Sequence, residues 1–408
     1  MKNIAIMACC DTKYHEVNYV REKIKASGCE PLVMDISTGG TVPIQAEISR
    51  EKMAARGGYS WEEICGAAKD EALSKMSKCA ALMLCELHEK KQIDAVLGMG
   101  GLQNTVVCSA AMQALPLGFP KLIVSTIASG NRYFDMVVGD SDIATMPSIV
   151  DFAGMNAIAE LILSNACAAI TGMANNASSA MREINGWRLG TTLMGITNDT
   201  VMHATNILLD AGLEVLSFHS TGVGGRTMEK MIEHGSINAV MDMTLHEMTP
   251  EYFNGRGYSA GSNNRLCAGA KKGIPMVVCP GGIDFICLSP ADFFDDEEER
   301  GYGWHNASLT HTRLYEHEIL DITGTIIRRL NESAGKVVIL LPMGGLRTLS
   351  RPGELFHKPQ TIKKMKEVFE KNLKPEIVLK CFDLNYMDKE FAEIAAAEML
   401  ALLKNHGR

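Results

Sequence analysis

The sequence predicts an α/β protein of two tandem Rossmann-like domains, each a doubly wound parallel sheet, with a cleft between them. Short apolar runs rich in Val, Ile and Leu alternate with amphipathic segments of helix length. The same series of motifs occurs twice, and glycine-rich turns follow the apolar runs. Strands that are apolar throughout need cover on both faces, which helices on either side of a parallel sheet provide.

The first half of the chain is expected to alternate strands with helices. The expected strands lie near residues 3–8, 31–36, 93–98, 121–125 and 136–139. The expected helices lie near residues 13–27, 72–91 and 103–114. A further amphipathic helix is predicted at residues 388–404, close to the end of the sequence.

The second half repeats the order of the first. The matching pairs are residues 5–12 with 193–200, 27–39 with 211–222, 93–98 with 237–242, and 118–124 with 273–278. Matches in one order predict two copies of one doubly wound unit, with extra strands near 336–341 and 376–382 in the second. The small polar run at 174–179 is typical of a linker, so the domains are predicted at 1–180 and 187–408.

Charge and cysteine usage narrow the expected partners and location. The net charge of −8 gives no electrostatic footprint for nucleic acid or an anionic membrane, which leaves a small molecule as the expected ligand. The 12 cysteines are scattered without a CxxC motif, which predicts reduced thiols in a cytoplasmic protein. The first residues do not form a signal-peptide pattern, and no apolar run reaches the roughly 18 residues of a membrane span.

Glycine and hydroxyl residues follow the strands expected in the first domain. Ligands of open α/β sheets bind beyond the carboxyl ends of the strands. The candidate ligand-binding residues there are Asp11, Thr12, Lys13, Gly98, Gly100, Gly101, Ser125, Ser129, Gly130 and Asp140. Glycines let the backbone approach an anion, and helix N-terminal N–H groups donate to it. The same residue types are also ordinary in turns, and the absence of GxxxxGK[ST] and GxGxxG argues against a Walker NTPase and a typical NAD dehydrogenase.

The run from His219 to Met228 is the sharpest motif of the second domain. Its predicted ligand-binding residues, with those of a later glycine turn, are Ser220, Thr221, Gly222, Gly224, Gly225, Arg226, Gly281 and Gly282. His219 and Asp242 are the candidate catalytic residues, as acid or base, and the following helix is expected to begin near Thr227. Alternatively, the glycines only shape the turn, Arg226 is a surface charge, and Asp242 caps a helix.

Two further features of the second domain carry residue types used in binding sites. His305, His311 and His317 recur every six residues, which does not keep one helix face, so the pattern favours surface histidines over a zinc site. The glycine-containing strand end at residues 340–347 is expected to add an anion contact through Arg347 or Arg351. No metal-ligating residues are assigned.

Taken together, several motifs resemble those of one known family. They are residues 11–13, Asp35 and residues 48–51, 98–101, 125–130, 222–226 and 340–342. In this order they resemble the ATP-binding domain family of the tomato mosaic virus resistance protein (Tm-one-like) and its bacterial relatives, from Lys2 to about Ala396. The resemblance implies ATP and Mg²⁺ as cofactors, two subdomains and a homodimer.

The chain departs from that family at one turn. Residues 100–105 read Gly-Gly-Leu-Gln-Asn-Thr, where relatives usually carry Gly-Gly-Ser-Gly-Gly-Thr. Larger side chains there are expected to narrow a phosphate cradle in the first domain, so a ligand site is favoured near His219 and Arg226.

Three functions are compatible with these residues. The first is a protein that binds ATP or another phosphate or carboxylate ligand, or an enzyme of small-metabolite carbon metabolism. The second is a hydrolase or lyase acting on a sugar-acid-like metabolite, with His219 as acid or base. The third is a non-catalytic regulatory interaction module.

Overall fold

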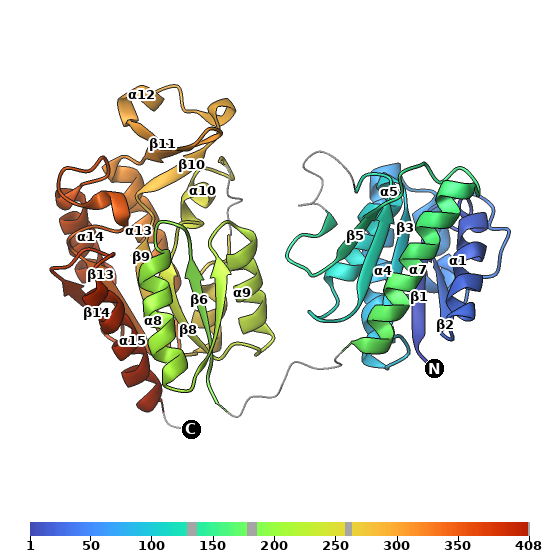
Figure 1. The fold of residues 1–408 in the computed structure, drawn as a ribbon, viewed down its shortest axis with the longest axis horizontal. Coiled ribbons are helices and arrows are strands. Elements are labelled where there is room, and N and C mark those ends of the chain that lie inside the picture. Colours follow the sequence, from blue (N-terminus) through green and yellow to red (C-terminus); the bar gives the residue numbers. More distant parts are fainter. Residues whose placement is uncertain (129–136, 178–185, 258–262, 407–408) are drawn as a thin grey trace. The chain divides into compact units, whose positions relative to one another are not determined.

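The computed structural model describes residues 1–128, 137–177, 186–257 and 263–406. The chain divides into two compact units, unit 1 from Met1 to Glu183 and unit 2 from Ile184 to Arg408. Each unit contains its own parallel sheet with helices on both faces (Figure 1). The predicted α/β class with two Rossmann-like parallel sheets is therefore confirmed, whereas the cleft between the domains stays a prediction.

Unit 1 contains a five-stranded sheet in the order β2-β1-β3-β4-β5, in which all paired strands are parallel. The strands are β1 (Asn3–Ala8), β2 (Glu30–Asp35), β3 (Ala95–Gly100), β4 (Lys121–Ser125) and β5 (Ala144–Pro147). β1 therefore lies between β2 and β3, and after β2 the chain crosses over β1 to form β3 on its other side. The carboxyl ends of β1 and β3 thus form a topological switch point, where open α/β sheets bind ligands.

Helices cover both faces of this sheet. They are α1 (Tyr14–Ala26), α2 (Arg50–Arg56), α3 (Trp61–Cys65), α4 (Lys69–Glu89), α5 (Leu102–Gln113) and α7 (Ala157–Asn176). Alternate strand residues point to opposite faces, so Ile4 and Ile6 pack against α1 and α7, while Ala5 and Met7 pack against α2, α4 and α5.

One helix of unit 1 also has the length and composition of a membrane span. In α7 the most apolar window has a mean hydropathy of 1.5, and 39% of it is buried. Its inner face, with Leu163, Ala166 and Ile170, belongs to the core under the sheet. Asn156 caps the helix, because its side chain accepts hydrogen bonds from the backbone N–H groups of Ile158 and Ala159.

The last strand of unit 1 lies later than predicted. Residue 136 is outside the described residues, Val137 is helical and buried in the core, and β5 begins only at Ala144. The turn at residues 139–142 therefore precedes β5. Asp142 pairs with the Lys121 ammonium at 2.6 Å, at the amino end of β4. Asp140, predicted to bind ligand, consequently lies toward the amino ends of the strands, which corrects that assignment.

Unit 2 contains a six-stranded parallel sheet in the order β14-β13-β9-β8-β6-β7. The strands are β6 (Arg188–Leu193), β7 (Glu214–His219), β8 (Ala239–Thr244), β9 (Met276–Gly281), β13 (Val337–Pro342) and β14 (Val378–Phe382). When the strands of each parallel sheet are numbered from its own first strand, both sheets have the order 2-1-3-4-5, and β14 adds a sixth strand to the sheet of unit 2. The last three pairs of matching segments overlap β2 and β7, β3 and β8, and β4 and β9, whereas the first pair reaches only the last residue of β6, Leu193, because that strand ends earlier than expected.

Helices also cover both faces of the second sheet. They are α8 (Asn198–Asp210), α9 (Val223–Glu233), α10 (Met248–Tyr252), α11 (Cys267–Lys272), α12 (Glu297–Arg300), α13 (Glu316–Asn331), α14 (Pro359–Asn372) and α15 (Lys389–Lys404), with short 3-10 turns η1 (Pro290–Asp292) and η2 (Thr348–Ser350). Side chains of α8 and α15 share one core, and side chains of α9, α13 and α14 share the other.

A small antiparallel sheet adds to unit 2 near the carboxyl ends of the main strands. Its strands are β10 (Phe285–Leu288), β12 (Leu309–Arg313) and β11 (Tyr302–Asn306), in that spatial order. This sheet was not expected from the sequence. β10 starts only four residues after β9 ends, so this sheet stands beside the strand ends where a ligand is expected (Figure 1).

Candidate functional site

The glycine turn after β7 leads directly into α9. This helix begins at Val223 rather than near Thr227, so Gly224, Gly225 and Arg226 lie in its first turn. Gly222 has φ +99°, a left-handed conformation that favours glycine. Arg226 is half-buried, and an added Cβ on Gly224 would collide with the carbonyl oxygen of His219.

A carboxylate of the chain itself occupies this turn. Glu247 Oε1 accepts hydrogen bonds from the backbone N–H groups of Gly222, at 2.5 Å, and Gly225, at 3.0 Å. These N–H groups lie at the N-terminus of α9, where a helix attracts an anion. The motif predicted to bind an external phosphate or carboxylate thus holds an internal carboxylate.

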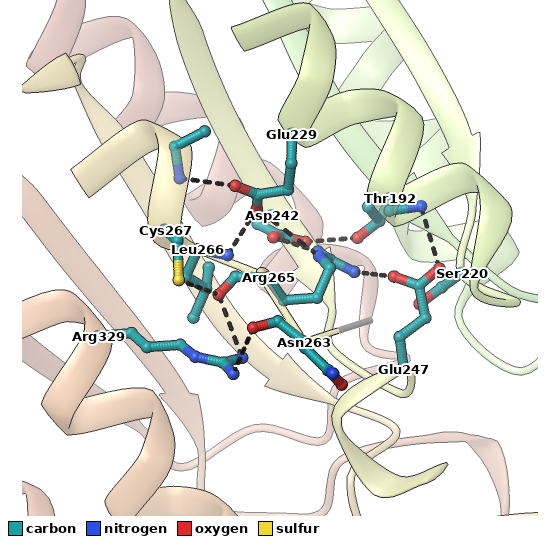
Figure 2. Close-up of polar contacts among 12 residues, drawn as sticks. Thr192, Ser220, Glu229, Asp242, Glu247, Asn263, Arg265, Leu266, Cys267 and Arg329 are labelled. Carbon is teal, nitrogen blue, oxygen red and sulfur yellow. Dashed lines mark hydrogen bonds and ion pairs between the residues drawn. The ribbon is translucent and has the colours of Figure 1, made fainter. Parts of the chain in front are cut away.

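Glu247 belongs to a buried ion cluster around Arg265 (Figure 2). The Arg265 guanidinium donates to Glu247 and Asp242, and its Nε lies 3.9 Å from Glu229 Oε1. The other carboxylate oxygen of Asp242, Oδ1, accepts a hydrogen bond from Thr192 Oγ1 at 2.5 Å. Arg265, Asp242 and Glu247 are fully buried and Glu229 is 1% exposed. We call these four charged residues the Arg265 cluster.

The Arg265 cluster holds three carboxylates against one guanidinium. Burial raises the pKa of Glu229 to about 7, which limits the excess of negative charge. Glu229 also accepts from the backbone N–H groups of Leu266, at 2.6 Å, and Ala268, at 2.7 Å, and so fixes the start of α11. These contacts join α9, β8 and α11, so the cluster ties together three elements of unit 2.

The candidate catalytic residues His219 and Asp242 are not brought together. His219 is exposed at the end of the edge strand β7. Asp242 is buried in β8, on the far side of β6, and both its carboxylate oxygens are engaged by Thr192 and Arg265. Asp242 therefore serves as an ion-pair partner in the core, and the predicted acid–base arrangement is not assembled.

The other predicted residues of unit 2 have backbone roles. The Ser220 hydroxyl donates to the carbonyl oxygen of Thr244 at 3.0 Å, and the Thr221 N–H donates to that of His219 at 2.8 Å. Gly281 packs tightly on Tyr386, and the Gly282 carbonyl oxygen lies 2.9 Å from His246 Nδ1.

Replacing Gly225 with alanine is expected to destabilise unit 2 by about 1–3 kcal/mol. The added Cβ would overlap Glu247 Oε2, so the carboxylate would have to leave the helix N-terminus. Gly195→Ala is the matched control, because an added Cβ there meets nothing within 4 Å. Urea denaturation of both variants measures the difference, and equal stabilities would show that Glu247 moves without cost.

The switch point of unit 1 presents a different helix N-terminus. α5 begins at Leu102, and within the described part of the chain no side chain caps it at Gly101. Gly100 has φ +144°, and an added Cβ there would strike Asn104. The Asn104 side chain packs against the protein interior. It donates to the Met99 carbonyl oxygen at 3.3 Å and accepts from Cys9 Sγ at 2.5 Å.

This arrangement corrects the expected narrowing of the cradle. Asn104 is 6% exposed and serves as a buried link between β1 and α5, while Leu102 is 50% exposed. Gly101, which precedes the helix, has no side chain that could cover the first N–H groups of α5.

The remaining candidates of unit 1 divide between the switch point and the core. Asp11 Oδ1 is buried and has no hydrogen-bond partner among the described residues, and Thr12 is exposed. Lys13 donates to the Phe152 carbonyl oxygen, and Ser125 Oγ lies 2.6 Å from Thr105 Oγ1. Gly98 is buried inside β3 against Cys108, which makes it a packing residue and corrects its assignment. Ser129 and Gly130 lie outside the described residues.

Comparison with known proteins places both units in one family. The model described as Uncharacterised protein family (UPF0261) N-terminal domain matches residues 2–179, and the C-terminal domain model of that family matches residues 187–403. A UPF0261 protein of Clostridium tetani is 32% identical, with 99% of each chain covered. The ToMV resistance protein Tm-1 of Solanum lycopersicum is 29% identical over 96% of this chain and 54% of its own, so this chain spans about half of it.

Solved structures give a weaker likeness. A putative UDP-N-acetylglucosamine 2-epimerase from Listeria monocytogenes is 11% identical, with 68% of this chain and 79% of that chain covered and a TM-score of 0.25.

Proposed function

The chain belongs to the uncharacterised protein family UPF0261, and we propose that it binds a phosphate-bearing small molecule at the switch point of unit 1, with ATP and Mg²⁺ as the candidate ligand and ion. The observation that carries the proposal is the uncapped N-terminus of α5. The first N–H groups of a helix have no partner within the helix and attract anions. Gly101 lets a phosphate approach these groups closely.

Neighbouring side chains support this site. Thr126 follows β4, and its Oγ1 lies 3.7 Å from the position that a Cβ on Gly101 would occupy, so its hydroxyl lies beside the turn. Asp11 follows β1, and its unpartnered Oδ1 suits a cation. Because Mg²⁺ is often bound by one or two carboxylates together with substrate phosphates, Asp11 would hold the ion.

Unit 2 supports the same assignment by contrast. The N-terminus of α9 is already neutralised by Glu247, so a second anion there would meet a carboxylate. The hydrolase or lyase alternative would use His219 as acid or base, and His219 is exposed at the end of the edge strand β7. Phosphate binding is therefore assigned to the first unit, although the sequence favoured the second.

ATP with Mg²⁺ is expected to raise the melting temperature of unit 1. A ligand at a hundred times its dissociation constant stabilises the native state by about 2.7 kcal/mol, which corresponds to roughly 5–11 °C for a unit of this size. Gly101→Asp should abolish the shift, because its carboxylate would cap α5 and repel phosphate. The unliganded variant should be as stable as the parent protein within a few tenths of a kcal/mol, since Asp is a favoured N-cap residue.

Two further variants make this thermal-shift experiment specific. Gly172→Asp adds the same charge on the exposed side of α7, where a Cβ meets nothing within 4 Å, and should keep the full shift. Asp11→Asn should remove the dependence on Mg²⁺. A shift that persists in Gly101→Asp places the ligand elsewhere, and no shift in the parent protein rejects ATP.

A further inference from the structure

A second set of buried polar side chains lies in unit 2, beside the small antiparallel sheet. It consists of Arg347, Asp284, His246 and His311, which we call the Arg347 cluster. His246 follows β8, Asp284 follows β9, Arg347 follows β13, and His311 lies in β12. None is more than 6% exposed. Phe285 joins the set, because its ring lies 4.3 Å from the ring of His246 and 4.5 Å from that of His311.

The Arg347 guanidinium has unsatisfied donors. Its Nε and Nη2 have no hydrogen-bond partner in the described part of the chain, and its Nη1 lies 3.4 Å from His311 Nδ1. Asp284 Oδ2 is 4.0 Å from Nε, which is too long for a hydrogen bond. The guanidinium carbon lies 4.0 Å and 3.7 Å from the ring centroids of Phe285 and Phe356. The aromatic rings thus pack against the guanidinium, while Nε and Nη2 have no hydrogen-bond partner among the described residues.

Two acceptors of the cluster are unpaired as well. His246 Nδ1 lies 2.9 Å from the Gly282 carbonyl oxygen and so carries the proton, because a carbonyl only accepts. Among the described residues, His246 Nε2 is then a buried acceptor without a partner, and Asp284 Oδ1 is a second one. Burial lowers the pKa of His246 to about 4 and that of His311 to about 3, so both rings are neutral near pH 7.

We propose that the Arg347 cluster binds a small α-hydroxycarboxylate, whose carboxylate accepts from Nε and Nη2 of Arg347 and whose hydroxyl donates to His246 Nε2. The Nε–Nη2 edge of a guanidinium matches the two oxygens of a carboxylate. Each buried polar atom left unpaired costs about 1–3 kcal/mol, so a group that pairs with several of them binds favourably.

Charge favours a monoanion over a phosphate dianion at this place. One guanidinium is opposed by one nearby carboxyl group, Asp284, and the two histidines are neutral. A cavity of about 10 Å³, room for one water molecule, adjoins the cluster at Asp284 and is also lined by Phe356, Ser350 and Lys358, so a ligand of this class has to displace neighbouring side chains to enter. Lys358 contributes a second cationic group to its wall. The site is separate from the ATP site proposed in unit 1.

Calorimetric titration of the full chain with glycolate, acetate and inorganic phosphate tests the proposal. Glycolate should bind about two- to tenfold more tightly than acetate, which lacks the hydroxyl, and phosphate more weakly than either. Arg347→Met should weaken glycolate binding about tenfold to a hundredfold, since a charged hydrogen-bonding partner is lost. Arg351→Met is the matched control: Arg351 lies on the same loop, its side chain is 49% exposed, and glycolate affinity should not change.

His246→Phe isolates the role of the hydroxyl. The ring can still stack on Phe285, but the acceptor is gone, so glycolate should fall to the affinity of acetate while acetate binding is unchanged. Gly101→Asp in unit 1 should leave glycolate binding intact, which separates this inference from the proposed ATP site.

Several results would overturn the inference. No binding of glycolate at millimolar concentration would show that water alone satisfies the cluster. Tighter binding of phosphate than of glycolate would reject the ligand class, and unchanged binding in Arg347→Met would reject Arg347 as the anchor. Should Arg347→Met not fold by circular dichroism, the ranking of the three probes and the His246→Phe variant decide the question.

Discussion

Replacing Arg265 with methionine is expected to lower the free energy of unfolding of unit 2 by about 3–5 kcal/mol, because it leaves buried carboxylates uncompensated. Asp242 and Glu247 would both lose their guanidinium partner, and Glu229 its nearest cation. Methionine keeps an unbranched side chain in the same space, so the loss reports on charge more than on packing.

Denaturant unfolding at several pH values measures this effect. In the variant, the guanidinium no longer offsets the burial of these carboxylates, so protonation of buried carboxyl groups relieves uncompensated negative charge in the folded state. The folded variant then binds more protons than the unfolded chain, so the deficit should shrink as the pH falls toward 5. Arg351→Met, which removes an exposed pair with Asp388, should cost no more than about 1 kcal/mol. A deficit independent of pH would contradict the electrostatic explanation.

Replacing Glu247 with alanine is expected to cost a similar 3–5 kcal/mol and to create a binding site for a small carboxylate. Arg265 would lose one partner, and the N–H groups of Gly222 and Gly225 would be left unpaired in a buried place. Acetate has the size of the missing group, so it should restore part of the stability as its concentration rises.

Thermal denaturation with and without acetate tests this rescue. Glu247→Gln keeps the volume of the side chain and leaves no room, so acetate should stabilise it no more than it stabilises the parent protein. Potassium chloride at equal ionic strength controls for screening by salt. If acetate raised the melting temperatures of the two variants equally, the vacated space would not be an anion site.

The sequence predicted the fold well because its strands are apolar throughout. Runs such as residues 121–125 and 337–342 are buried on both faces, so composition alone identifies them. β5 was misplaced because it has only four half-buried residues, whereas Val137 and Val138 imitate a strand. The small antiparallel sheet was missed because His305 and His311 follow no regular apolar alternation.

The position of the candidate site was easier to predict than its contents. The glycines after β7 and β3 marked two helix N-termini, which are local features. Which of them is neutralised depends on Glu247, 25 residues after Gly222 in the chain, and on Arg265 beyond it. Such contacts arise only when β7 and β8 are placed in one sheet. Neither spacing nor composition carries that information.

The internal carboxylate has a consequence for competition by free anions. Glu247 is attached to the same folded unit as the N–H groups of Gly222 and Gly225, so its effective concentration beside them is set by geometry and not by the surrounding solution. Well-oriented groups within one molecule reach effective molarities far above the solubility of any salt. A dissolved phosphate would therefore lose to this tethered competitor at every accessible concentration. In related chains, a glycine-rich turn indicates phosphate binding only where no acidic side chain of the chain itself accepts from the N–H groups of that turn.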